Sequence, residues 1–164
     1  MLYEKYHLNL DYDKLVEECF RIEKETTERE YISNLNGGVQ IHDEAWVNKF
    51  PGSYIQTELL PAIINFVSEK MGCEISIHIW LNINYQGSYN YPHEHGDCDK
   101  SGVIYVKTPK DSGNLIFTKT NEELEPEPGM IVLFDPQVWH GVSPNFSEEP
   151  RISFAFNCTK IQKK

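Results

Sequence analysis

Residues 75–85 carry the most regular hydrophobic pattern of the chain. In the sequence ISIHIWLNINY every odd position is apolar or aromatic, and the even positions are polar except for Trp80. Because successive side chains of a β-strand point to opposite faces, this period of two predicts a strand with one buried face.

Four shorter segments after residue 100 are also rich in β-branched and aromatic residues. Turn-forming sequences separate them, namely PKDSG, ELEPEPG and SPNFSEEP. This combination predicts further short strands. The predicted strands are 102–108, 114–119, 130–135 and 151–158.

The first third of the chain has apolar residues at helical spacing instead. The pattern predicts a helix over 11–30, with Asp11 or Asp13 as its N-cap. It predicts a second helix over 52–72, in which Pro61 should produce a kink or start a new first turn.

The order of these elements indicates the fold class. Helices followed by several closely spaced strands favour a mainly β protein, a β-sandwich or jelly roll with the helices packed on one sheet. The length of 164 residues fits a single domain. We expect residues 1–72 to form a helical N-terminal part and residues 73–158 to form the β core. The segment 34–46 is expected to be a loop.

Composition excludes some classes of function. No apolar run is long enough to span a membrane, and the acidic N-terminus does not look like a signal peptide, so we expect a cytoplasmic protein. The net charge of −10 argues against direct nucleic-acid binding. The four cysteines lack CxxC spacing; only Cys98 lies near other chemistry-bearing residues.

Three histidines are candidates for a metal site. His93 and His95 stand two residues apart, so in an extended segment both imidazoles point the same way. His140 follows 45 residues later, at the end of a predicted strand. A close pair with one distant ligand forms a three-sided cap whose open positions suit Fe(II) in an oxygenase.

A candidate anion site follows eleven residues after His140. Arg151, Ser153 and Ala155 share one face of the last predicted strand, as a pocket wall would. Arginine can hold a carboxylate with two parallel hydrogen bonds. If 130–140 and 151–158 are neighbouring antiparallel strands, the arginine returns beside the histidine.

The motifs YPHEH, SGVIYV, PGMIVLFDPQVWHGV and RIS together resemble those of the Fe(II)/2-oxoglutarate-dependent oxygenases. The similarity covers roughly residues 75–158. It is greatest to the short, single-domain, prolyl-4-hydroxylase-like members. The resemblance implies a double-stranded β-helix (a cupin-like jelly roll) that binds Fe(II), 2-oxoglutarate and O₂.

The resemblance also implies roles for individual residues. Arg151 and Ser153 match the Arg-x-Ser that holds the far carboxylate of 2-oxoglutarate, and Tyr85 and Tyr105 resemble the tyrosines of that pocket. Such enzymes convert 2-oxoglutarate into succinate and CO₂ while hydroxylating a substrate. A peptide, protein or prolyl substrate fits the members most similar to this chain.

One motif departs from the family pattern, which is His-x-Asp or His-x-Glu. The pair His93 and His95 puts a histidine where the carboxylate belongs, whereas His95 and Asp97 supply the expected pair literally. The Pro-His entry at Pro92 favours the first interpretation. A set of His93, His95 and His140 leaves the metal one charge more positive than the usual triad.

Two other functions remain open at this stage. A cupin-like three-histidine iron dioxygenase would bind a small acid directly to the metal, with Arg151 holding its carboxylate. A non-enzymatic jelly-roll module would use the histidines to hold a structural Zn(II). Both alternatives use the same site residues, but in neither of them is 2-oxoglutarate consumed.

Overall fold

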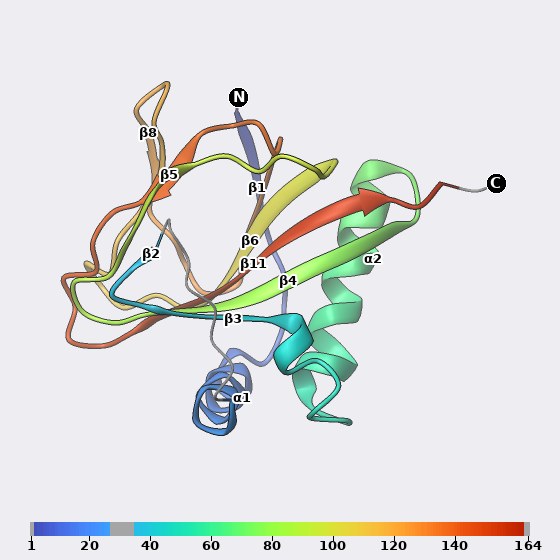
Figure 1. Ribbon diagram of the computed structural model, residues 1–164, viewed down its shortest axis with the longest axis horizontal. Helices are drawn as coiled ribbons and strands as arrows, with labels where there is room; N and C mark the ends of the chain where they lie inside the picture. The colour runs from blue at the N-terminus through green and yellow to red at the C-terminus, as the bar shows by residue number, and fades with distance from the viewer. Residues whose placement is uncertain (1, 27–34, 163–164) are drawn as a thin grey trace.

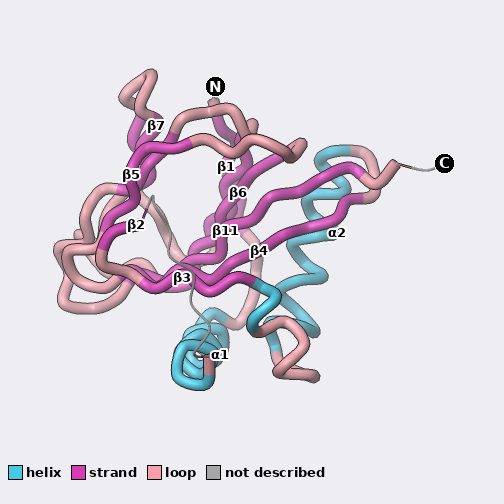
Figure 2. Tube along the Cα trace, viewed as in Figure 1, coloured by secondary structure: helices cyan, strands magenta, loops and turns pink. Residues whose placement is uncertain are grey.

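The structure, a computed structural model, describes residues 2–26 and 35–162. Two antiparallel sheets face one another, and both helices lie against the outer face of the larger sheet (Figures 1 and 2). The predicted jelly roll with helices packed on one sheet is therefore confirmed.

The larger sheet has six strands in the order β1-β9-β6-β11-β4-β3. Its strands are β1 (Tyr3–His7), β3 (Val39–His42), β4 (Ile75–Asn84), β6 (Lys100–Lys107), β9 (Met130–Phe134) and β11 (Arg151–Lys160). The smaller sheet has five strands in the order β2-β5-β10-β7-β8. These are β2 (Leu35–Asn36), β5 (Tyr89–His93), β7 (Leu115–Phe117), β8 (Glu122–Leu124) and β10 (His140–Val142).

The long central pair, β4 and β11, separates the core from the space between the sheets. The two strands pair over ten residues, from Arg151 opposite Asn84 to Lys160 opposite Ile75. The isoleucines and leucine at the odd positions of β4 pack into the helix-covered core. Three even positions of β4, Trp80, Asn82 and Asn84, line a cavity between the sheets. The period of two is thus confirmed, but the second face is largely enclosed as well.

Helix α1 (Tyr12–Glu25) begins where the sequence predicts. The Asp11 side chain accepts a hydrogen bond from the backbone N–H of Lys14, which satisfies one of the unpaired donors of the first turn. The buried face of the helix consists of Leu15, Cys19 and Ile22. The helix ends at Glu25, because Thr26 is already extended, so it is shorter than the predicted helix over 11–30; residues 27–30 lie outside the described part of the chain.

Helix α2 (Leu60–Met71) follows a single π-helical segment, Ile55–Leu59. Pro61 lies in its first turn, where the missing N–H leaves no hydrogen bond unmade. Gly72 ends the helix with a φ of 69°, a left-handed conformation that favours glycine. The prediction that Pro61 starts a new first turn is confirmed.

The N-terminal part is not purely helical, which corrects the expected division at residue 72. Strand β1 pairs with β9, and β3 pairs with β4, so both belong to the larger sheet. Segment 34–46 is likewise not only a loop, since it contains β2, β3 and a 3₁₀ turn at Asp43–Ala45. Strands of two to five residues have too few alternations for a pattern to reveal them.

The described part of the chain contains no helix that is both long and apolar enough to cross a membrane.

Candidate metal and carboxylate-binding site

The three predicted histidines meet at one end of the cavity. His93 is the last residue of β5 and His140 is the first of β10, and the two are direct partners across this antiparallel pair. His95 lies two residues beyond β5, where its backbone N–H donates to the carbonyl of Pro136 at 2.7 Å. One ligand nitrogen from each histidine lies within 4.8 Å of the others.

Backbone contacts fix the orientation of two of these rings. His93 Nδ1 lies 2.8 Å from the carbonyl of Tyr91, and His140 Nδ1 lies 2.8 Å from the carbonyl of Val138. Because a carbonyl can only accept, each Nδ1 carries the proton and each Nε2 keeps its lone pair. A ligand histidine whose second nitrogen donates to a carbonyl is the usual arrangement around a protein-bound metal.

Burial keeps the three imidazoles neutral. Desolvation, together with the neighbouring His93, lowers the pKa of His140 to about 3 and that of His95 to about 4. Desolvation also lowers the pKa of His93 itself. Neutral imidazole is the form that binds a metal, so protons compete little for this site near pH 7.

The close approach of β5 and β10 depends on a residue without a side chain. A Cβ atom on Gly141 would lie 3.0 Å from the carbonyl oxygen of Asn90 and 3.2 Å from the nitrogen of Pro92. The pairing register also shifts between His140 and Val142, an irregularity next to the histidine cluster. The sequence contained Gly141 in its motif, but gave no sign of this packing role.

Asp97, the alternative ligand, lies outside the cluster. Its side chain is exposed, and the group that could hold an ion in the described residues consists of the three histidines. Asp99 is also exposed, and its carboxylate accepts from the backbone N–H of Lys160 at 2.8 Å. Cys98 is half-buried, with its sulfur 3.5 Å from the Ser101 hydroxyl.

The cavity between the sheets, about 570 Å³ including its open mouth, joins the histidines to Arg151. Arg151, Ser153 and Ala155 all line it, as their shared face on β11 predicts. The strand pairing that we expected to bring Arg151 beside His140 is wrong, however. Strand β6 lies between β9 and β11, and β10 belongs to the other sheet. Arg151 and His140 therefore lie in different sheets and share the cavity rather than a strand pair.

Arg151 is buried without compensation. It is 2% exposed, and its Nε and Nη1 atoms have no hydrogen-bond partner among the described residues. Burial lowers the pKa of its guanidinium. An unpaired cation in the interior is costly, so the donor set fits a ligand with a carboxylate.

The two predicted tyrosines are placed differently. Tyr105 lines the cavity opposite Ser153 in the pairing of β6 with β11, and burial raises its pKa to about 12. Tyr85 is absent from the residues that line the cavity. It is 37% exposed, and its hydroxyl donates to the Glu23 carboxylate at 2.6 Å. Tyr85 follows the last residue of β4, where the alternation of the strand no longer fixes its direction.

Several cavity residues were not anticipated from the sequence. The unpredicted polar members are amides, Gln40, Asn82, Asn84 and Asn90. Two of them occupy the even positions of β4, which the alternation marked as polar but did not mark as enclosed. Trp80, on the same face, contacts His95 with ring centroids 5.9 Å apart.

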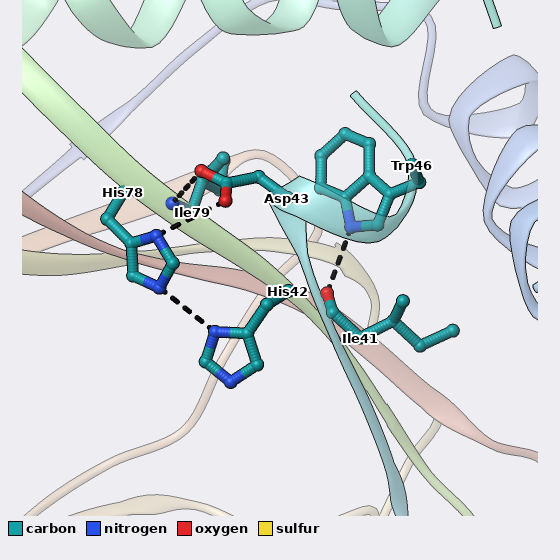
Figure 3. A network of polar contacts seen from close by, with 6 residues as sticks. All are labelled: Ile41, His42, Asp43, Trp46, His78 and Ile79. Carbon is teal, nitrogen blue, oxygen red and sulfur yellow. Dashed lines mark hydrogen bonds and ion pairs between the residues drawn. The ribbon is translucent and has the colours of Figure 1, made fainter. Parts of the chain in front are cut away.

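A polar network of His42, Asp43 and His78 (Figure 3) lies next to Trp80. The ring of His42 stacks on Trp80 at 5.6 Å, and His42 Nδ1 lies 2.9 Å from His78 Nε2. Asp43 pairs with His78 Nδ1 at 3.2 Å and accepts from the backbone N–H of Ile79 at 3.0 Å. These contacts tie the end of β3 to β4 beside the histidine cluster.

We compared the chain with known protein families and with curated proteins. Residues 120–157 match a family described as "Putative 2OG-Fe(II) oxygenase". This segment includes β9, His140, Arg151 and Ser153. No curated protein matches the chain significantly in sequence.

Solved structures share the fold over nearly the whole chain. A prolyl-4-hydroxylase from Pseudomonas putida is 20% identical, with a TM-score of 0.72 over 98% of this chain and 94% of that one. The viral collagen prolyl hydroxylase of Paramecium Bursaria Chlorella virus-1, solved with 2OG, is 16% identical, with a TM-score of 0.69 over 98% and 97%. A prolyl hydroxylase from Trichoplax adhaerens is 9% identical, with a TM-score of 0.73 over 97% and 84%. The resemblance predicted from the motifs is thereby confirmed: residues 120–157 match a 2OG-Fe(II) oxygenase family, and the whole chain has the fold of these hydroxylases.

Proposed function

We propose that this protein is an Fe(II)- and 2-oxoglutarate-dependent oxygenase that hydroxylates its substrate. The observation that carries the proposal is the unpaired, buried guanidinium of Arg151 in the same cavity as three neutral histidines. One end of the cavity suits a divalent metal and the other suits a carboxylate. 2-Oxoglutarate is a molecule with a metal-chelating end and a distant carboxylate.

The metal ligands in this proposal are His93, His95 and His140. Neutral imidazole suits iron, and three ligands on one side leave positions open for other molecules. The carbonyls of Tyr91 and Val138 orient two of the rings. Because no carboxylate belongs to the set, the bound metal keeps its full double charge, which favours an anionic cosubstrate.

The cosubstrate contacts in this proposal are Arg151, Ser153 and Tyr105. The guanidinium neutralises the far carboxylate, while the Ser153 and Tyr105 hydroxyls lie opposite one another on β11 and β6 to hydrogen-bond it. When bound, iron and 2-oxoglutarate supply the oxidising chemistry, in which 2-oxoglutarate and O₂ give succinate, CO₂ and a hydroxylated product. The chain positions these groups and limits access of water through the apolar parts of the cavity wall.

The proposal also covers the class of substrate and the cellular location. The three structures compared above are prolyl hydroxylases, and the one from Trichoplax adhaerens was solved with a peptide fragment. These likenesses support a peptide or protein substrate. We place the enzyme in the cytoplasm as a single domain, and its net charge of −10 supports no direct contact with nucleic acid.

The three-histidine set also favours a second candidate function. A dioxygenase without a cosubstrate would bind a small organic acid between the metal and Arg151. The two candidates differ in what they consume. The first requires 2-oxoglutarate for every turnover, and the second consumes O₂ with its substrate alone.

The deciding experiment is an anaerobic titration of the Fe(II)-loaded protein with 2-oxoglutarate. We expect a weak visible charge-transfer band that saturates, followed in air by slow formation of succinate without added substrate. The matched controls are Arg151→Ala, which removes the buried guanidinium, and Arg21→Ala, which removes a surface guanidinium paired with Glu25. Absence of both band and succinate in wild-type protein with bound iron would refute the proposal.

A further inference from the structure

Two amide side chains project into the cavity from the edge of the larger sheet. Gln40 of β3 and Asn82 of β4 are direct partners in the antiparallel pairing, and both line the cavity. Gln40 as a whole residue is only 8% exposed, and its amide faces the cavity.

These amides satisfy only part of each other's hydrogen-bonding capacity. Gln40 Nε2 donates to Asn82 Oδ1 at 2.9 Å. Gln40 Oε1 and Asn82 Nδ2 then have no partner among the residues that the structure describes, and neither atom is fully buried. If both amides were rotated by half a turn, the mutual bond would reverse and again leave one donor and one acceptor. The pair therefore presents one unpaired NH₂ group and one unpaired oxygen acceptor in either assignment.

The deeper amides of the cavity are used differently. Asn84 Nδ2 donates to Ser88 Oγ at 3.0 Å and to Asn90 Oδ1 at 3.3 Å. Those bonds tie the end of β4 to the following turn and to β5. The donors of Asn84 thus already have partners within the protein, whereas Gln40 and Asn82 can still form hydrogen bonds with a ligand.

The position of the pair in the cavity follows from the pairing of β4 with β11. Along β4, Asn84 faces Arg151, Asn82 faces Ser153 and Trp80 faces Ala155 in the pairing with β11. Trp80 in turn contacts His95. Asn82 therefore belongs to the row that connects Arg151 to the histidines, next to Ser153, and Gln40 lies beside it on the β3 side of the sheet.

We propose that Gln40 and Asn82 form a substrate subsite that recognises an amide group, either a carboxamide or a peptide bond. This inference rests on the proposed function for the presence of the metal nearby. An amide offers both an acceptor and a donor, and so satisfies both amides of the pair. An ester of the same shape lacks the N–H and leaves Gln40 Oε1 without this hydrogen bond, which lowers its affinity relative to the amide.

The test uses protein loaded with Zn(II) and 2-oxoglutarate, so that no reaction occurs. The probes are N-acetylglycine methylamide and methyl acetoxyacetate, its ester analogue. Nuclear magnetic resonance of the side-chain NH₂ groups should show shifts at Gln40 and Asn82 with the amide, and about tenfold or more weaker binding of the ester. Equal binding of the two probes, or shifts confined to other amides, would overturn the proposal.

Variants of the two amide residues test their hydrogen bonds directly. Gln40→Met and Asn82→Leu keep the approximate size of each side chain but remove its hydrogen bonds, and each should reduce the preference for amide over ester to less than twofold. Gln137→Met is the matched control, because Gln137 is exposed and does not line the cavity. Should either variant fail to fold, the wild-type shifts still decide.

The outcomes also separate the two proposals. If 2-oxoglutarate fails to bind the metal-loaded protein, the proposed function fails, and the probes added to protein with metal alone still test the amide pair. If 2-oxoglutarate binds but the two probes are not distinguished, only the amide subsite is wrong.

Discussion

His93 and His140 are direct partners in the pairing of β5 with β10, and the glycine after His140 allows these strands to approach. Two potential metal ligands are therefore fixed by backbone pairing rather than by side-chain packing. His95, on the loop after β5, completes the cluster through its backbone bond to Pro136.

Gly141→Ala should weaken metal binding without removing a ligand. The new Cβ would press on the carbonyl of Asn90 and on Pro92, and so separate His93 from His140. We expect about a tenfold loss of affinity for Zn(II) or Co(II), in the range seen for changes around a metal site. Competition titration with a chromophoric chelator measures it. Gly96→Ala is the control, because a Cβ there meets open space right beside His95; an equal loss in both variants would contradict the packing argument.

The choice between the two ligand interpretations can be decided by a pair of variants. His93→Ala should abolish tight metal binding, because it removes one of three convergent nitrogens. Asp97→Ala should leave the affinity within twofold, because its carboxylate is exposed and outside the cluster. Isothermal titration of the apoprotein with Fe(II) under anaerobic conditions gives both values. The reverse result would establish His95 and Asp97 as the pair.

Arg151→Met should separate stability from ligand binding. The substitution removes a buried cation that lacks partners for two of its nitrogens, so we expect the apoprotein to become more stable by about 1–4 kcal/mol. The same change should weaken 2-oxoglutarate binding by about 2–5 kcal/mol. Urea unfolding of the apoprotein and calorimetric titration with 2-oxoglutarate measure the two effects. A destabilised variant with normal 2-oxoglutarate affinity would assign Arg151 a structural role.

Tyr105 should make the folded state sensitive to alkaline pH. Burial raises its pKa from 10 to about 12, so between these values the folded state holds a proton that the unfolded state has lost. Its contribution to stability is complete below pH 10 and is lost as pH rises to 12, with a slope of up to about 1.4 kcal/mol per pH unit. Tyr105→Phe should flatten this part of the profile in urea unfolding.

The sequence alone was sufficient for features that depend on local periodicity. The alternation in β4 predicted a strand and the face of that strand that packs into the core, because a period of two is visible within ten residues. Asp11, Pro61 and Gly72 marked the helix boundaries through backbone chemistry that acts within one turn. The motif around Arg151 and Ser153 placed both on one face for the same reason.

Only the tertiary structure decided which distant residues meet. Nothing local to β3 indicates that Gln40 pairs with Asn82, and nothing in the sequence of β11 indicates that β6 rather than β9 lies beside it. Tyr85 and Tyr105 looked equivalent, yet one lies outside the cavity and the other inside. Strand order and register are set by the packing of whole sheets, whose energy depends on contacts between residues far apart in the chain, and short-range patterns do not encode them.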